Sequence, residues 1–146
     1  MFDQILSTAN ISASGLTAER LRMEVIANNI ANAHTTRTPQ GGPFRRQQVV
    51  FASAYENALA IRNSDTQKFG GVRVVGIQPD DSELPRLYQP GHPDADEQGF
   101  VVMPNVKPAN EMVDLISASR AYEANLQVLR SFREMAEQAL SLLRGV

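Results

Sequence analysis

The stretch that most constrains the fold is PANEMVDLISASRAYEANLQVLRSFREMAEQALSLLR, at residues 108–144. Its apolar residues recur every three or four positions, which predicts a long helix over residues 109–144 with a buried face. Pro108 suits the first turn, and Asn110 is a candidate N-cap. The apolar residues form two adjacent stripes: Met112, Leu115, Tyr122, Leu126, Leu129, Ala136, Leu140 and Leu143 in one, and Val128, Phe132, Met135, Ala139 and Leu142 in the other. Two stripes require more than one partner helix.

A second long helix is predicted at the other end of the chain, over residues 3–33. Its apolar residues follow the spacing of a coiled-coil seam, interrupted only by Arg20. They are Phe2, Leu6, Ala9, Ala13, Leu16, Met23, Ala27 and Ile30. We therefore expect the two terminal helices to pack as a coiled coil, with residues 1–33 and 108–146 forming one discontinuous helical domain.

Residues 34–107 form a central insert of different character. They contain seven of the eight prolines and most of the glycines, so no long helix fits there. Short strands are predicted at residues 72–77 and 99–103, with Leu87 and Tyr88 as a candidate third strand. Between Thr35 and Phe69 we expect an irregular loop. The predicted fold class is mainly α with a small loop and β-hairpin insert.

The composition excludes several classes of function. The chain has 146 residues, about one domain, with a net charge of −2 and no cysteine. Disulfides, cysteine-rich zinc sites and thiol nucleophiles are excluded, and sequence-independent nucleic-acid binding is disfavoured. Phosphate-binding, dinucleotide and nucleophile-elbow motifs are absent. His92, Asp94 and Asp96 lie among turn-forming residues, which favours a turn over a metal site. We expect no enzyme activity, no cofactor and no small-molecule substrate.

Charge is segregated within the insert. Residues 37–73 have a net charge of +4, and residues 80–97 have a net charge of −5. Two interpretations stay open: two solvated loops, or contacts between the basic segment of one subunit and the acidic segment of the next. The candidate residues for such contacts are Arg45, Arg46, Asp80, Asp81, Asp94 and Asp96.

Asparagines are concentrated near the end of the first helix, at Asn28, Asn29 and Asn32. Asparagine is a poor helix former, so its occurrence at three of the five positions 28–32 needs an explanation. One interpretation is a fraying end with Asn32 as a left-handed cap. The other is an amide-bearing face that binds peptide groups of a neighbour.

The second apolar stripe of the C-terminal helix points to assembly. A two-helix hairpin of this length would leave a long apolar strip exposed, which soluble monomers rarely do. Side-by-side polymerisation through the terminal helices would cover the strip, as would a fold-back of the insert. A soluble hairpin adaptor or chaperone that binds a partner helix is the competing class of function.

Three groups of residues carry a resemblance to a known family. At the N-terminal end they are residues 14–16, 27–33 and 35–36, and at the C-terminal end residues 111–125. In these segments the chain resembles bacterial flagellar rod and hook proteins. Residues 71–74, 88–96 and 99–106 are similar to the proximal rod members of that family.

The resemblance implies a structural subunit of the basal-body rod, the periplasmic shaft that transmits torque from the membrane ring to the hook. Its implied partners are itself, other rod proteins, an adaptor at the rod base and the flagellar type III export apparatus. Export without a cleaved signal peptide fits a start with no basic residue before Arg20. Asn28, Asn29 and Asn32 would end the inner helix. The implied packing residues are Phe2, Leu6, Leu16, Met23, Ile30, Met112, Leu115, Tyr122, Leu126, Leu129, Leu140 and Leu143.

Overall fold

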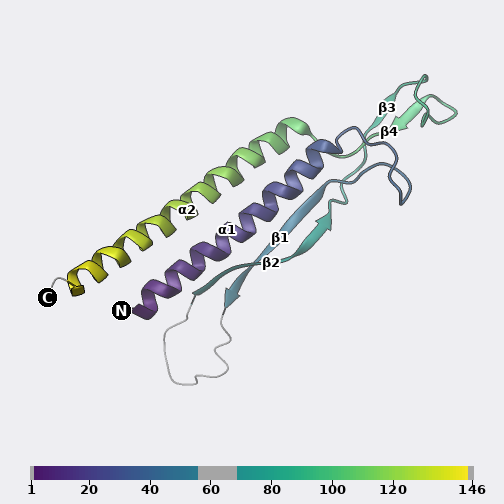
Figure 1. The fold of residues 1–146 in the computed structure, drawn as a ribbon. Helices are drawn as coiled ribbons and strands as arrows, with labels where there is room; N and C mark the ends of the chain where they lie inside the picture. Colours follow the sequence, from purple (N-terminus) through teal and green to yellow (C-terminus); the bar gives the residue numbers. More distant parts are fainter. Residues whose placement is uncertain (1, 56–68, 145–146) are drawn as a thin grey trace. The chain divides into compact units, whose positions relative to one another are not determined.

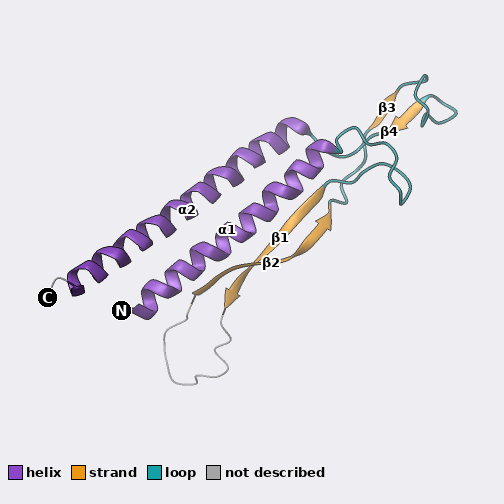
Figure 2. Ribbon diagram, viewed as in Figure 1, coloured by secondary structure: helices purple, strands orange, loops and turns teal. Residues whose placement is uncertain are grey.

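The computed structural model describes residues 2–55 and 69–144 (Figure 1). Within them the chain forms two long helices, one toward each end of the sequence, with the strands between them in sequence (Figure 2). The elements are α1 (Phe2–Ala31), β1 (Gln47–Tyr55), β2 (Phe69–Pro79), β3 (Arg86–Tyr88), β4 (Phe100–Val102) and α2 (Pro108–Arg144). The fold is therefore mainly helical with a β insert, as predicted. Among the described residues, no helix is both long enough and apolar enough to cross a membrane.

The N-terminal end of α2 differs in one detail from the prediction. The helix begins at Pro108, and the Lys107 carbonyl accepts hydrogen bonds from the N–H groups of Asn110 (2.9 Å) and Glu111 (3.1 Å). Asn110 is thus inside the first turn, and its prediction as the N-cap was wrong. Proline is well placed at this first position because its missing N–H would have no partner within the helix.

The strands form two antiparallel pairs. β1 pairs with β2, and the Asp80 N–H just after β2 donates to the Arg46 carbonyl just before β1 (2.7 Å). β3 pairs with β4, with Leu87 opposite Val101. The strands predicted at 72–77, 87–88 and 99–103 are confirmed with altered bounds. The irregular loop expected from Thr35 to Phe69 was wrong for β1, whereas residues 56–68 lie outside the described residues.

The chain divides into two compact units. Unit 1 comprises residues 1–21, 51–75 and 118–146, and unit 2 comprises residues 22–50 and 76–117. Each unit contains part of both helices and part of the β insert.

In unit 1, α1 is approached closely on two sides. The Ser14 hydroxyl donates to the Ile11 carbonyl (2.6 Å) and accepts the Val72 N–H of β2 (3.1 Å). On another side, a Cβ added at Gly15 would lie 3.0 Å from the Asn125 side chain of α2. Small residues in α1 therefore permit both contacts.

The buried side chains of α1 only partly match its predicted seam. The most buried described residues of α1 are Ser12, Ala18, Val25, Ile26 and Asn29. Seam members Leu16, Met23 and Ile30 are half-buried, and Ala13 and Ala27 are exposed. A helix with contacts on two sides buries small and polar residues as well as large apolar ones, so apolar spacing alone locates the face imperfectly.

Candidate functional site

Unit 2 contains a polar network that begins with Asn29 near the end of α1. The Asn29 amide donates to the Gln47 carbonyl of β1 and to Glu111 Oε2 of α2, each at 2.9 Å. Its Oδ1 accepts the Gln47 N–H, also at 2.9 Å. Asn29 and Glu111 are 0% and 1% exposed. One buried amide thus joins both helices to the first strand.

Arg46 carries the positive charge of the network. Its Nε donates to Glu111 Oε1 at 2.6 Å, and its Nη atoms reach Asp114 (3.4 Å) and Asp80 (3.5 Å). Arg22 lies 3.9 Å from Asp114. Burial acts to lower the pKa of Arg46, but hydrogen bonds and charge from Glu111 and Asp80 outweigh it and raise that pKa. The guanidinium therefore stays charged and balances the buried Glu111 carboxylate.

Asn105 ties the segment after β2 to this network. Its Oδ1 accepts the Arg46 N–H (2.7 Å), and its amide donates to the Asp80 carbonyl (3.0 Å) and Ser82 Oγ (2.8 Å). The Asp80 carboxylate accepts the Ser82 N–H (2.9 Å) and the Gln48 amide (2.9 Å). The hydrogen bonds from Ser82 contribute most to lowering the pKa of Asp80, so Asp80 remains ionised at neutral pH.

Arg46 and Asp80, both proposed for contacts between subunits, pair with each other within the chain. Arg46 and Asp80 belong to the network just described. Arg45 is exposed, and its guanidinium donates to the Asp80 carbonyl at 3.5 Å. Asp81 is exposed as well. Contacts of Arg45 or Asp81 with another subunit stay a prediction.

The other two acidic candidates lie near the β3–β4 pair. Asp94 accepts the Thr36 hydroxyl (2.8 Å) and lies 3.9 Å from Arg37. Asp96 pairs with Arg86 at 2.5 Å and accepts the Phe100 N–H, which is the largest cause of its lowered pKa. Within the described residues, no group of three or more metal-binding side chains is arranged to hold an ion.

The three asparagines have different environments. Asn32 donates to the Asn28 carbonyl (2.9 Å) and accepts the Thr35 hydroxyl (3.2 Å). No described residue other than glycine has a positive φ, so the interpretation of Asn32 as a left-handed cap was wrong. Asn28 is exposed, whereas Asn29 is buried against its own chain. The Asn28 Oδ1 accepts the Asn32 amide at 3.4 Å, so the binding of a neighbour's peptide groups by this face stays a prediction.

Glu111 was not predicted as part of this site. One signal was available: Glu111 lies four residues before Leu115, on the same face of the helix as an apolar stripe. A carboxylate at such a position must have a buried partner. The partner Arg46 was singled out, but for contacts between subunits.

The implied packing residues whose side chains are described lie at half-buried and exposed positions. Those that are half-buried are Leu16, Met23, Ile30, Leu115, Tyr122, Leu126 and Leu129. Met112 and Leu140 are 57% and 58% exposed. The side chains of Phe2, Leu6 and Leu143 lie outside the described part. From Arg133 to Leu142 every side chain of α2 is exposed, including Met135 at 53% and Leu142 at 75%.

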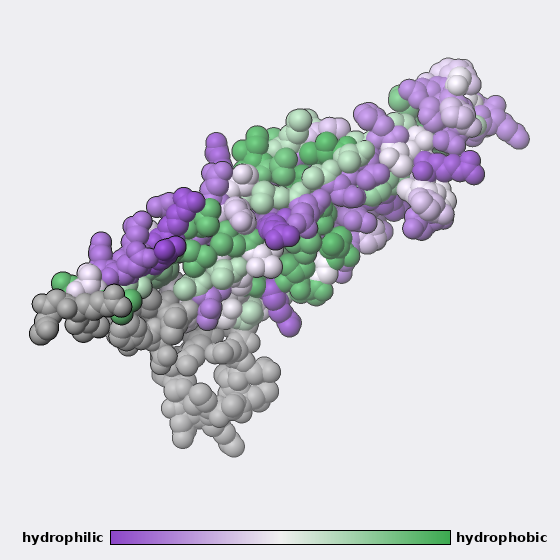
Figure 3. Space-filling view, viewed as in Figure 1, coloured by the Kyte–Doolittle hydropathy of each residue, from purple (hydrophilic) through white to green (hydrophobic). Residues whose placement is uncertain are grey.

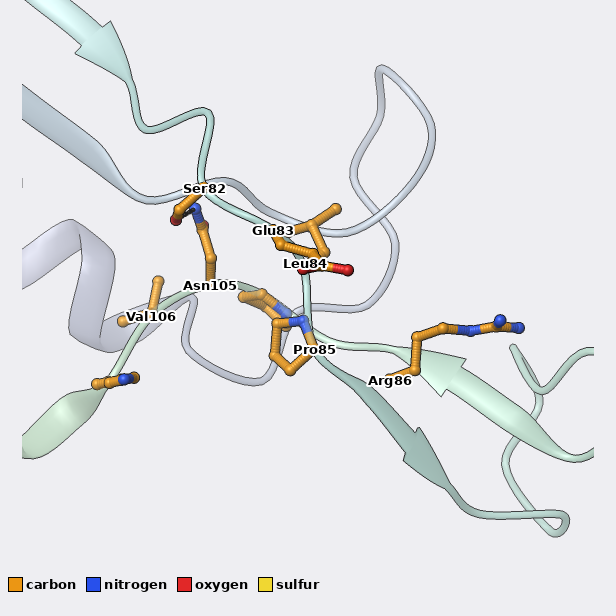
Figure 4. A pocket seen from close by; sticks show the side chains of 9 residues that line it. Ser82, Glu83, Leu84, Pro85, Arg86, Asn105 and Val106 are labelled. Atoms are coloured by element: carbon orange, nitrogen blue, oxygen red, sulfur yellow. Dashed lines mark hydrogen bonds between the residues drawn. The ribbon is translucent and has the colours of Figure 1, made fainter.

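A shallow groove of about 520 Å³ lies beside the β3–β4 pair (Figure 4). It runs between residues 82–86 and 104–107, with Pro85, Leu84 and Val106 among its lining residues. Its charged residues Glu83, Arg86 and Lys107 are all exposed to water.

Comparison with known proteins matches both ends of the chain to flagellar families. Residues 10–37 match the family described as flagella basal body rod protein, and residues 97–142 match the C-terminal family of the flagellar basal body rod FlgEFG proteins. The FlgC rod protein of Borreliella burgdorferi is 46% identical over 97% of this chain and 99% of its own length. The chain belongs to the FlgC family of flagellar basal-body rod proteins.

Other members of the FlgC family are nearly as similar. The Bacillus subtilis protein is 43% identical over 91% of this chain and 94% of its own length. The Salmonella typhimurium protein is 38% identical over 94% of this chain and 97% of its own length. The chain is therefore a structural rod subunit of the flagellar basal body and not an enzyme. Membership also implies assembly with itself and with other rod proteins, which the adaptor alternative does not explain.

Proposed function

We propose that this FlgC-family chain polymerises through its terminal helices into the proximal part of the periplasmic rod. Residues 1–33 and 108–146 are the assembly domain and pack as an inner coiled-coil layer, with residues 34–107 as the outer insert. The shaft transmits torque from the membrane ring to the hook. The subunit leaves the cell through the flagellar type III export apparatus without a cleaved signal peptide, and joins the adaptor at the rod base.

The observation that carries this proposal is the exposed end of α2. Val128, Met135 and Leu142 are seven residues apart and are 40%, 53% and 75% exposed. This heptad spacing is typical of a helix that packs along another helix. Isolated helices gain little stability in water, so a helix this apolar is stabilised best by neighbouring subunits.

The polar network of unit 2 supports the mechanical part of the proposal. A shaft that transmits torque requires elements that do not slide past one another. Hydrogen bonds between buried, fully partnered groups fix one arrangement, because any slip would leave a buried charge without its partner. Asn29, Arg46 and Glu111 can hold α1, β1 and α2 in a single register in this way.

The test places charges on the exposed α2 stripe. Val128→Asp together with Met135→Asp should abolish rod assembly and swimming in cells that lack the native subunit, because each aspartate would be desolvated in the interface. The matched control is Gln127→Asp with Gln138→Asp, which adds the same charges at exposed polar positions of the same helix. Swimming and the rod content of isolated basal bodies are measured.

The control should swim normally. Both variants should give the same circular dichroism as the unaltered chain, since all four positions are exposed. Normal rods in cells with the doubly charged stripe would refute polymerisation through this helix.

A further inference from the structure

Unit 2 has an exposed apolar surface on the first turns of α2. Met112, Val113 and Ile116 are 57%, 67% and 56% exposed, and we call these three residues the α2 patch. Figure 3 shows hydrophobic side chains gathered over this part of α2. Glu111 and Asp114, on the same turns, participate in the polar network instead. The patch therefore lies outside that network, and most of its surface faces water.

A second exposed apolar surface lies on β3. Leu87 and Tyr88 are 48% and 62% exposed, and we call these two residues the Tyr88 knob. The Tyr88 ring packs edge-on against Phe100, with 5.3 Å between ring centroids. A Cβ added at Gly99, whose φ is +80°, would lie 2.9 Å from Tyr88, so the ring also rests on this glycine. An exposed aromatic held in place in this way resembles the rigid anchors found at binding interfaces.

Each of these two surfaces has an exposed charge nearby, of opposite sign to the other's, while Arg86 beside Leu87 is paired with Asp96. Lys107 is exposed immediately before α2, near the α2 patch. Glu97 is exposed two residues before Gly99, near the Tyr88 knob. Opposite charges at the rim of an interface favour one orientation of the partners over others.

We propose that the Tyr88 knob of one subunit docks on the α2 patch of a second copy of this chain, with Glu97 facing Lys107. The inference rests on the proposed polymerisation. A contact between two different surfaces can repeat along a rod, whereas a surface that pairs with itself gives a closed dimer. Methionine in the patch adapts readily to an aromatic side chain.

The absence of cysteine permits a direct test by cross-linking. Leu87→Cys and Val113→Cys are introduced into one chain, and isolated basal bodies are oxidised. Because each subunit would contribute one cysteine to each of two contacts, the double variant should form a ladder of covalent dimers, trimers and longer multimers. Neither single variant should form such a ladder.

The matched control combines Val113→Cys with Gln78→Cys, an exposed position on β2. If chains with Leu87→Cys and Val113→Cys assemble into working rods but yield no more multimers than this control, the docking is wrong while the rod proposal stands. Dimers from Leu87→Cys alone would also overturn it, since they indicate a self-paired surface.

Charge reversal tests the same contact while leaving both apolar surfaces intact. Lys107→Glu and Glu97→Lys should each lower the yield of rods several-fold at low salt, and the two together should restore it. This experiment decides the matter if the cysteine variants fail to enter the rod. Single reversals that have no effect, or losses that the double reversal does not repair, would overturn the proposal.

Discussion

Glu111 is the residue on which the polar network of unit 2 depends most. Burying a carboxylate costs several kcal/mol of hydration unless charge and hydrogen bonds replace the water. Both carboxylate oxygens have such a partner: Oε1 accepts from Arg46 at 2.6 Å and Oε2 accepts from Asn29 at 2.9 Å. Burial of the Glu111 carboxylate is therefore favourable only when both Arg46 and Asn29 are present.

Replacing this carboxylate should destabilise the chain strongly. Glu111→Ala leaves the Asn29 amide and the Arg46 guanidinium without their shared acceptor, so we expect a loss of about 2–4 kcal/mol in the free energy of unfolding. Urea unfolding of the purified chain measures this loss. Glu134→Ala, at an exposed position of the same helix, is the control and should change stability by less than about 0.5 kcal/mol. Equal effects of the two changes would mean that the network contributes nothing.

The sequence identified only half of this network. Asn29 was noticed because asparagine is unusual within a helix, and Arg46 because basic residues cluster around it. Neither pattern reveals the partner, since Asn29 and Glu111 are 82 residues apart and meet only in the folded chain. A polar residue on an apolar stripe predicts that a buried partner exists, but not which residue it is.

The contact between α1 and β2 depends on a glycine. Gly71 has a φ of +88°, and a Cβ there would lie 2.3 Å from Ser14 Oγ. The neighbouring N–H of Val72 donates to that same hydroxyl. Gly71 thus combines a left-handed backbone with the closest approach of strand to helix, and only glycine satisfies both.

Gly71→Ala should therefore lower the free energy of unfolding by more than the strain of a left-handed backbone alone would. Gly41 provides the control, because its φ is +91° but a Cβ there would meet nothing within 4 Å. We expect Gly41→Ala to lose about 1–2 kcal/mol from backbone strain, and Gly71→Ala a further 1–3 kcal/mol or so from overlap. Thermal unfolding of both variants measures the difference. Equal losses of stability in the two variants would show that the close contact between α1 and β2 does not contribute to stability.

The helices were easier to predict than the strands. Over 30 or more residues the 3.6-residue period repeats many times, and the predicted ranges 3–33 and 109–144 differ from α1 and α2 by at most two residues at either end. β1 was missed because its nine residues, QQVVFASAY, mix strand formers with alanine, serine and glutamine. Its position is set by pairing with β2, which lies at least 14 residues further along the chain.

At the level of the whole molecule, apolar surface is left on the C-terminal end of α2, where the proposed polymerisation would cover it. The buried side chains of α2 include Glu111 and Ala118, in its first eleven residues, whereas residues 133–142 are all exposed. A helix segment without burial opens readily in an isolated chain. Membership of the FlgC family supplies the missing partners, because rod subunits assemble with one another.

Hydrogen–deuterium exchange on the full chain, compared between dilute monomer and isolated rods, tests polymerisation through the terminal helices most directly. In the monomer, residues 108–118 should exchange slowly and residues 133–142 quickly. In the rod, both segments should exchange slowly, because neighbouring subunits cover the exposed end of α2. If residues 133–142 are already protected in a confirmed monomer, or stay unprotected in the rod, polymerisation through this helix is contradicted.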